Sequence, residues 1–388
     1  MLNIGFYYQG HLMQKEIIGA LKRLPNVKLF VFTIPGIISK EEVEKACKEL
    51  LKNNIRILFT VNDWGLDFEG ETAKFLNQHS IVHINWYPDD PFYYEIFFNK
   101  KLIAYPNELN FITDRSYIEL LKIRGIKSFY LPLASDPEIF YPLNPPCEYK
   151  RTTCFVGNSY YEQINSFTKD YEHYLDNLTP FLTNLYFEYQ KNPFIDLEAI
   201  IATRINSETL PDNLTFNKAV FILKHIVSNI FRKKLILSIA SEYPDFMVFG
   251  DNNWCLYLPS EKVSTSVKYY TNLSVTYQET KVNIDINRIV IRDGLTQRVF
   301  DCLNCGAFII SNYKHALAEL FNVHGDKKEV VAFENEQHLK ELIKYYLNHD
   351  LKRKDIAARG RERVLKEHTY DHRIAEIFRV LSKELGKI

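Results

Sequence analysis

One segment of the chain, Asp293 to Asn312, restricts the possible folds more than any other. Its sequence, DGLTQRVFDCLNCGAFIISN, predicts a turn, a short amphipathic helix, a tight glycine turn and a strand. The hydroxyl of Thr296 can cap the free amides at the start of the helix. Gly306 stands where a helix stop requires left-handed backbone, and the apolar run after it is typical of a strand buried on both faces. The segment therefore predicts a helix-to-strand step of an α/β fold.

The same segment has the charges of a phosphate site. A helix amino terminus offers unpaired amides and a partial positive charge, which suit a phosphate group. Arg298 lies on the first turns of the predicted helix and could neutralise that phosphate. Asp293 and Asp301, with seven residues between them, bracket this arginine, and an acid further into the helix can accept hydrogen bonds from a ribose. We therefore expect a nucleotide-sugar site here, with Gly294 and Thr296 at the helix start.

Each charged side chain also has a structural interpretation. Asp293 could simply cap the helix, without contacting a ligand. Asp301 could be an exposed or capping acid, and Arg298 could pair with a surface carboxylate. Asn287 and Arg288 end the preceding predicted strand, where strand ends face a ligand cleft. Arg288 is therefore a second candidate for the phosphates.

The segment resembles the donor-domain signature of GT-B glycosyltransferases, and it is most similar to the spore-maturation CgeB-like group, which is related to the retaining group 1 transferases. That signature has two glutamates with seven residues between them, then Cys-Gly and an apolar strand. Here both positions are aspartate, Asp293 and Asp301, and each is one methylene shorter. Residues 111–143, FITDRSYIELLKIRGIKSFYLPLASDPEIFYPL, resemble the closing segment of the same family's first domain. The resemblance covers roughly 80–150 and 240–370, and it implies a ribose contact for Asp301, a donor-sugar contact for Asp293 and retention of configuration.

Candidate residues in the first part of the chain follow predicted strands. Asp89 and Asp90, in NWYPDDP, come after a buried strand and could bind an acceptor or act as a base. The alternative is an Asx turn before Pro91, although a similar run recurs in the CgeB-like group. His11 follows the first strand, where the resemblance places the floor of the GT-B cleft. Asn62 and the acid after it end another strand and are expected on the acceptor side.

The order of predicted elements indicates two domains. Strands alternate with helices, which implies doubly wound parallel sheets. We expect an N-terminal Rossmann-like acceptor domain, a Rossmann-like donor domain with a helical insertion, and a final helix that packs back toward the first domain. The donor domain begins with TTCFVGN, whose Gly157 and Asn158 would let backbone amides approach an anion. The predicted bounds are 1–148 for the first domain, 149–366 for the second, about 159–240 for the insertion and 367–388 for the last helix.

Composition excludes several classes of protein. The 388 residues contain 48 basic and 48 acidic side chains, so no overall basic field attracts nucleic acid. Neither a G-x-G-x-x-G motif nor a Walker loop occurs, which argues against NAD and ATP folds. Cys302 and Cys305 form a single C-x-x-C, for which packing is a better explanation than zinc. Because the start has no signal-peptide pattern and no apolar run reaches the length of a membrane span, we expect a cytoplasmic protein.

These features together predict a GT-B glycosyltransferase that needs no metal and no cofactor. Its donor would be a UDP- or GDP-linked sugar, and its acceptor a glycan, a protein or, less favoured by the neutral charge, DNA. Three alternatives stay open: a sugar-nucleotide epimerase on the same fold, a degenerate protein that binds the nucleotide sugar without turnover, and a DNA-modifying glycosyltransferase. The sequence indicates neither the acceptor nor the oligomeric state.

Overall fold

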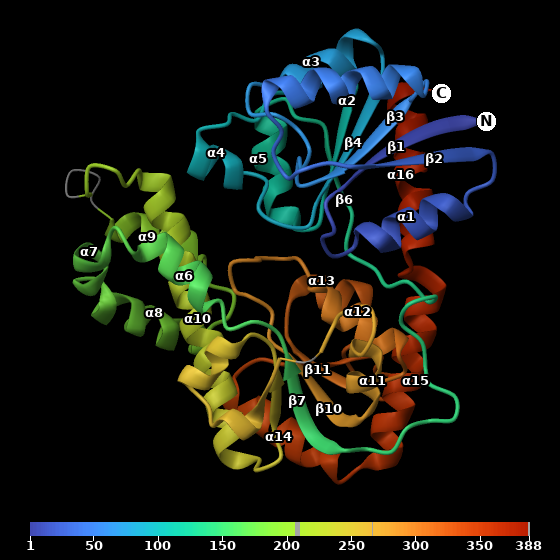
Figure 1. Cartoon of the computed structure of the whole chain (residues 1–388). Coiled ribbons are helices and arrows are strands. Elements are labelled where there is room, and N and C mark those ends of the chain that lie inside the picture. Colours follow the sequence, from blue (N-terminus) through green and yellow to red (C-terminus); the bar gives the residue numbers. More distant parts are fainter. Residues whose placement is uncertain (206–209, 266, 387–388) are drawn as a thin grey trace. The chain divides into compact units, whose positions relative to one another are not determined.

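The computed structural model describes residues 1–205, 210–265 and 267–386. The chain forms two compact units. The first consists of Met1–Asp136, Arg292–Leu295 and Glu367–Ile388, and the second of Pro137–Ile291 and Thr296–Lys366. The last helix, α16 (Tyr370–Leu385), therefore belongs to the first unit, although it follows the second in sequence (Figure 1).

The first unit is built on a parallel sheet of six strands in the order β2-β1-β3-β4-β5-β6. Every residue of the neighbouring strands β3 and β4 is buried, as expected for parallel strands covered on both faces. The register places Phe59 of β3 beside Ile84 of β4, and Ile84 beside Leu109 of β5. The strands are β1 (Leu2–Tyr8), β2 (Val27–Thr33), β3 (Ile57–Val61), β4 (Val82–Tyr87), β5 (Glu108–Ile112) and β6 (Ser128–Tyr130).

Helices cover both faces of this sheet (Figure 1). On one face, Leu50 of α2 and Leu76 of α3 pack into a cluster with Tyr7 of β1. On the other face, α1 contacts α16, and the ring centroid of Trp86 in β4 lies 5.9 Å from that of Tyr370 in α16. The further helices of this unit are α1 (Gln14–Arg23), α2 (Lys40–Lys52), α3 (Glu71–Gln78), α4 (Tyr93–Phe98) and α5 (Ile118–Ile123).

The second unit has its own parallel sheet of six strands, in the order β12-β11-β10-β7-β8-β9. Asn283 of the central strand β10 is in register with Cys154 of β7 and Ile309 of β11. The strands are β7 (Arg151–Val156), β8 (Met247–Phe249), β9 (Val263–Ser264), β10 (Thr280–Asp285), β11 (Ile309–Asn312) and β12 (Val331–Phe333). The helices after β9 are α11 (Leu273–Gln278), α12 (Gln297–Asn304), α13 (His315–Leu320), α14 (Glu336–Leu347) and α15 (Asp350–Glu367).

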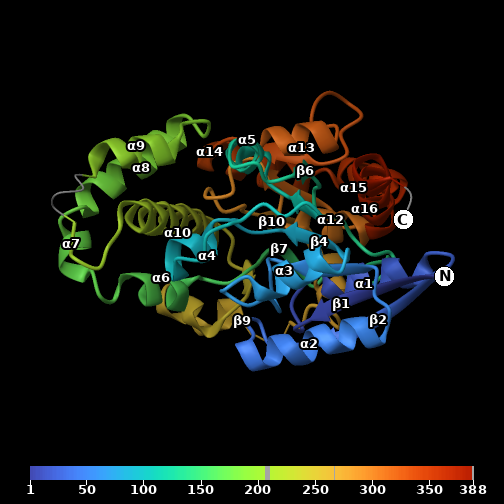
Figure 2. The same cartoon turned by 90° about the horizontal axis from the view of Figure 1, so that it is seen from above.

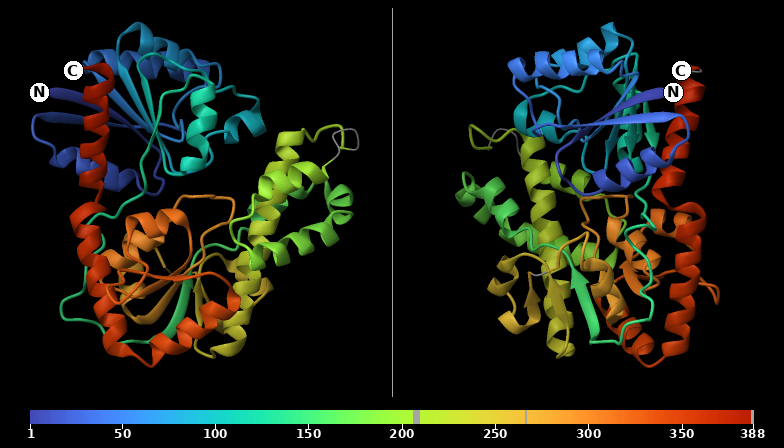
Figure 3. Two further views of the ribbon diagram at one scale, coloured as in Figure 1. Left: turned by 180° about the vertical axis from the view of Figure 1, so that it is seen from behind. Right: turned by 45° about the vertical axis from the view of Figure 1, so that its right-hand side comes forward.

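Among the described residues between β7 and β8, five further helices lie to one side of the second sheet (Figures 2 and 3). The longest, α10, has 27 residues and packs against α6, α8 and α9. In the part of the chain that the structure describes, no helix combines the length and apolarity that crossing a bilayer requires. The helices are α6 (Tyr161–Thr168), α7 (Glu172–Asp176), α8 (Thr179–Lys191), α9 (Leu197–Arg204) and α10 (Phe216–Glu242).

The predicted fold class, two doubly wound parallel sheets, is confirmed. One predicted element is wrong: the sequence LSVTYQ at residues 273–278 predicts a strand, but these residues form helix α11. Its buried residues Leu273, Thr276 and Tyr277 follow helical spacing, but a run of six residues is too short for periodicity to separate a helix from a strand.

Candidate functional site

Three arginine side chains of the second unit converge around one tyrosine at the carboxyl ends of β7 and β10. The guanidinium carbons of Arg232, from α10, and Arg288, from the loop after β10, lie 4.9 and 4.7 Å from the ring centroid of Tyr160. Arg298 comes from the first turn of α12, and its guanidinium carbon lies 5.6 Å from the ring centroid of Phe155. Three elements far apart in sequence therefore bring their positive charges to one place.

The electrostatic effect of these charges appears in the neighbouring titratable groups. Burial by itself would raise the pKa of the Tyr160 hydroxyl, but the charges of Arg288, Arg232 and Arg298 outweigh it and lower that pKa to about 8. Burial, with a smaller contribution from Arg288, lowers the pKa of His225 to about 3. The region therefore favours anions and disfavours cations.

One buried carboxylate, that of Asp285 at the end of β10, anchors Arg298. The arginine Nε donates to Asp285 Oδ1 over 2.7 Å, and the carboxylate is completely buried. The same carboxylate accepts hydrogen bonds from Asn287 Nδ2 and Ser311 Oγ, at 2.8 and 2.7 Å. Arg232 instead donates to backbone carbonyls, those of Asn158 and Ile286. Asp285 therefore fixes Arg298 without neutralising the whole cluster.

The turn after β7 lies directly against this cluster. A Cβ atom added to Gly157 would lie 3.3 Å from an Nη atom of Arg298. The Gly157 carbonyl accepts a hydrogen bond from the Trp254 indole over 2.9 Å, and a Cβ added to Gly250 would come within 2.3 Å of that oxygen. Tyr160, three residues further on, has a φ of 60°, a left-handed conformation that costs a non-glycine residue energy and often marks functional sites.

The start of α12 differs in detail from the prediction. Thr296 occupies the N-cap position, but its side chain caps no helix amide. Its hydroxyl donates to Asp285 instead, over 3.0 Å, and its own amide donates to Asn287 Oδ1 over 2.9 Å. The predicted capping role of Thr296 is therefore wrong: its hydroxyl is oriented toward the buried Asp285 carboxylate, and no helix amide donates to it.

The two aspartates of the signature belong to different units. Asp301, in α12, is completely buried, and its oxygens accept from the Tyr269 hydroxyl at 2.7 Å and from Gln297 Nε2 at 3.1 Å. Its interpretation as an exposed acid is therefore wrong, and the ribose contact stays a prediction. Asp293 and Gly294 belong to the first unit, where the Asp293 amide donates to Asp114 over 3.2 Å.

The first unit gathers its candidate residues at the carboxyl edge of its sheet. The His11 ring packs against the Trp64 ring at a tilt of 37°, with ring centroids 4.0 Å apart. The loop that carries His11 is held by Gln14, whose side-chain oxygen accepts hydrogen bonds from the amides of Gln9, Gly10 and His11 at 3.0, 3.1 and 3.2 Å. His11 is therefore placed by a fixed loop and an indole.

The turn after β3 is strained and lies next to the predicted acids. Asn62 and Asp63 both have left-handed backbone, with φ of 53° and 56°. Asn62 Nδ2 donates to Asp89 Oδ2 over 2.8 Å, so the predicted side chains Asn62 and Asp89 are in contact. Asp90 accepts a hydrogen bond from the Phe92 amide over 2.9 Å, which fits the alternative of an Asx turn before Pro91. Consecutive strained residues beside a carboxylate favour a functional role for this turn.

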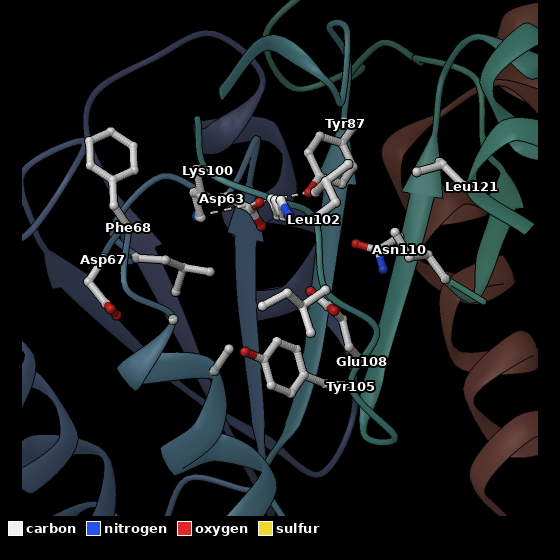
Figure 4. Close-up of a pocket in the computed structure, with 16 residues that line it drawn as sticks. Asp63, Asp67, Phe68, Tyr87, Lys100, Leu102, Tyr105, Glu108, Asn110 and Leu121 are labelled. Carbon is white, nitrogen blue, oxygen red and sulfur yellow. Dashed lines mark hydrogen bonds and ion pairs between the residues drawn. The ribbon is translucent and has the colours of Figure 1, made fainter. Parts of the chain in front are cut away.

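A cavity of about 50 Å³ lies over this sheet, and its polar lining residues include Asp63, Tyr87, Lys100, Tyr105 and Glu108 (Figure 4). The Asp63 carboxylate accepts from the Tyr87 hydroxyl over 2.8 Å and lies 3.8 Å from the Lys100 ammonium. Ligand-type atoms of Asp63, His83 and Glu108 lie within 4.8 Å of one another and could together hold a metal ion. The imidazole is also bonded within the protein, since Nδ1 lies 3.0 Å from Glu108. This side-chain network accounts for His83 without an ion.

Most of the predicted donor residues come together in the second unit. One group of contacts joins the predicted residues Gly157, Asn158, Asn287, Thr296 and Arg298. The other predicted arginine, Arg288, lies over the Tyr160 ring beside them. Sequence reasoning missed three members of this site: Arg232, Asp285 and Tyr160. Asp285 stands near the end of the predicted strand VNIDIN, and Tyr160 follows the predicted turn at Gly157. Their positions in the sequence could therefore have identified both residues as candidates. Arg232 lies within the helical insertion and had none.

Comparisons with known proteins give a family match for part of the chain and several similar folds. Residues 231–379 match the "Glycosyl transferase-like" family. No curated protein sequence matches the chain. The sucrose-phosphate synthase of Thermosynechococcus elongatus has a similar structure, with a TM-score of 0.58, 10% identity, and coverage of 99% of this chain and 100% of that one.

Two further solved structures are similar over the whole chain. HepE of Anabaena, in complex with UDP and glucose, gives a TM-score of 0.56 at 9% identity and covers 98% of this chain and 100% of its own. A glycosyltransferase involved in avilamycin A biosynthesis gives 0.52 at 9% identity, with coverage of 100% and 99%. The fold of the chain is therefore that of the GT-B glycosyltransferases.

Proposed function

We propose that the chain is a glycosyltransferase that moves a sugar from a nucleotide diphosphate to an acceptor hydroxyl. The observation that carries this proposal is the convergence of Arg232, Arg288 and Arg298 at the carboxyl edge of the second sheet. Ligands of open parallel sheets bind at this edge. The match to the glycosyl transferase-like family supports the proposal, because residues 231–379 include all three arginines. We also propose that the chain belongs to the CgeB-like group, although it has Asp293 and Asp301 where the signature of that group has glutamates.

The arginines suit a diphosphate leaving group. In the transfer, the bond between the anomeric carbon and the diphosphate oxygen breaks, and the acceptor oxygen bonds to that carbon. Negative charge grows on the diphosphate, and preorganised guanidinium groups stabilise it. Arginine also binds phosphate oxygens in a bidentate manner. Since three such groups supply the positive charge, we propose that the donor site needs no metal.

The acceptor is proposed to bind at the carboxyl edge of the first sheet. His11 is held on Trp64 there, and Asp89 is held by Asn62. The acceptor hydroxyl must lose its proton during transfer, and an imidazole or a carboxylate within hydrogen-bond reach can take it. Retention of configuration, which the resemblance implies, is proposed on that basis alone.

A thermal-shift titration with UDP, GDP, ADP, dTDP and CMP tests the donor site. A ligand at one hundred times its Kd stabilises the native state by about 2.7 kcal/mol, which a melting curve detects. One nucleotide should shift the wild type and lose its effect in Arg298→Gln and in Arg288→Gln. Arg359→Gln is the matched control, because that guanidinium pairs with Asp355 on α15. If no nucleotide shifts the wild type, the proposed donor site is wrong.

A protein that binds the nucleotide sugar without turnover is the second candidate. Two observations favour this candidate. Asp293 and Asp301 stand where the signature has glutamates, and the Asp301 carboxylate already accepts hydrogen bonds from Tyr269 and Gln297. Such a protein would show the same nucleotide shift, but it would release no diphosphate from any sugar nucleotide. Turnover therefore separates the two candidates.

A further inference from the structure

A second cavity lies at the opposite, amino-terminal edge of the sheet in the second unit. Its volume is about 380 Å³, within the range of small-molecule sites. Its walls come from the segment before β7, from the turn between α12 and β11, and from α15. Gly306 forms part of that turn with a φ of 69°. The cavity is therefore separate from the arginine cluster, which lies at the carboxyl ends of the strands.

The charged side chains that line this cavity are all basic. Arg353, Lys354 and Arg361 of α15 contribute to the wall, whereas none of the described lining residues is an aspartate or glutamate. The acids nearby are bound elsewhere or stand outside the wall. Glu279 pairs with Lys150 and Arg151, and the side chain of Asp350 is 54% exposed. The cavity therefore offers an anion a positive wall.

Arg353 is the most deeply buried basic side chain in the wall of this cavity. Its side chain is only 1% exposed. One Nη atom donates to the Tyr346 carbonyl over 2.7 Å, and the other pairs with Asp350 at 2.8 Å. Its buried Nε has no hydrogen-bond partner among the described residues. A buried donor without a partner costs free energy, and a ligand oxygen would remove that cost.

The remaining lining suits a compact organic group. Pro142, Ala357 and Phe308 give the cavity an apolar side, and the exposed Tyr149 ring lies 5.4 Å from the guanidinium carbon of Arg353. Arginine recognises phosphate through a planar pair of N–H donors, and lysine through a point charge. We propose that this cavity is a binding site for a small organic phosphate, of about the size of a sugar phosphate.

The site is connected to the donor site through one short helix. Arg361 Nε donates to the carbonyl of Asn304, the last residue of α12, over 3.2 Å. Arg298 lies on the first turn of the same helix, which has eight residues and spans about 12 Å. A phosphate bound to Arg361 in the cavity wall holds this side chain, and with it the contact to the end of α12, in place. The consequence is a regulatory role, in which the organic phosphate makes the end of α12 more ordered.

Isothermal titration with glucose 6-phosphate, inorganic phosphate and glucose tests the proposal. The wild type should bind glucose 6-phosphate, and inorganic phosphate at least tenfold more weakly, while glucose gives no signal. The double variant Lys354→Gln/Arg361→Gln should lose at least tenfold in affinity for glucose 6-phosphate. Lys352→Gln removes one positive charge from the same helix outside the cavity and should bind as the wild type does. Both changed side chains of the double variant lie at least partly at the surface, so folding should be kept.

Arg298→Gln separates this site from the donor site, because it should keep full affinity for glucose 6-phosphate. Hydrogen exchange supplies a second readout, with slower exchange expected at residues 303–308 and 353–361 on adding the sugar phosphate. Equal binding of inorganic phosphate would overturn the organic part of the proposal. If glucose 6-phosphate binding is lost in Arg298→Gln but kept in the double variant, the proposed site is wrong. The site is also wrong if the wild type does not bind glucose 6-phosphate.

Discussion

The ionisation of Tyr160 gives a sensitive test of the arginine cluster. Its pKa is lowered to about 8 because three guanidinium charges outweigh its burial. At pH 9 about nine tenths of this hydroxyl should be ionised, compared with about one tenth for an ordinary tyrosine with a pKa of about 10. Burial raises the pKa of other tyrosines of the chain, that of Tyr243 to about 12. One additional phenolate per chain is therefore expected at pH 9.

Difference absorbance near 295 nm measures that phenolate. The wild type at pH 9 should exceed Tyr160→Phe by one phenolate, whereas Tyr243→Phe should match the wild type. A bound diphosphate would offset the positive charge and raise the pKa of Tyr160, so a nucleotide that binds the cluster should reduce the signal. Equal absorbance of the wild type and Tyr160→Phe at pH 9 would refute the convergence of the arginines on this ring.

The same pKa fixes the sign of a stability effect. A group whose pKa is lower in the folded state stabilises that state once pH exceeds the folded value, and this stabilisation is lost as pH falls through it. For Tyr160 the window runs from about pH 8 to about pH 10. The difference between these two pKa values corresponds to a stabilisation of about 3 kcal/mol. The stability difference between the wild type and Tyr160→Phe should grow by that order from pH 7 to pH 10 in urea unfolding.

Two further substitutions test the packing that supports the site. Asp285→Asn removes the buried carboxylate bonded to Arg298 and should lower the free energy of unfolding, measured in urea, by about 3 kcal/mol. The control Asp355→Asn changes an exposed carboxylate and should alter the free energy of unfolding by less than about 0.5 kcal/mol. Equal effects of the two substitutions would contradict the supporting role of Asp285. Gly250→Ala places a Cβ 2.3 Å from a backbone oxygen and should cost about 2 kcal/mol by overpacking. Gly36→Ala, which meets no atom within 4 Å, is its control, and two similar melting curves would show that the close approach is not maintained.

The parts of the fold that the sequence predicted best are those whose pattern is local. The buried strand β3 (ILFTV) appears as an almost continuous apolar run, because both of its faces are covered. Strand β4 is equally buried, although its sequence VHINWY includes His83 and Asn85. Helix α11 was missed because six residues carry too little periodicity. The role of Thr296 was missed for a different reason, since its partner Asp285 is eleven residues away and only the tertiary fold brings the two together.

The candidate site shows the same limit. Arg298 and Arg288 could be predicted because they flank a helix start and a strand end. Arg232 could not, because it reaches the site from the middle of α10, through hydrogen bonds to Asn158 and Ile286 that are 74 and 54 residues distant in sequence. Asp301 shows that spacing alone does not give exposure, since its carboxylate is completely buried.

Release of a nucleoside diphosphate from sugar nucleotides tests the central claim most directly. The purified chain would be incubated with UDP- and GDP-linked sugars, with and without a mixture of glycan acceptors, and the free diphosphate measured over time. We predict release from one donor, accelerated by an acceptor, unchanged in Arg359→Gln and lost in Arg298→Gln. A chain that binds a nucleotide but releases no diphosphate from any donor would contradict transfer and identify a binding protein.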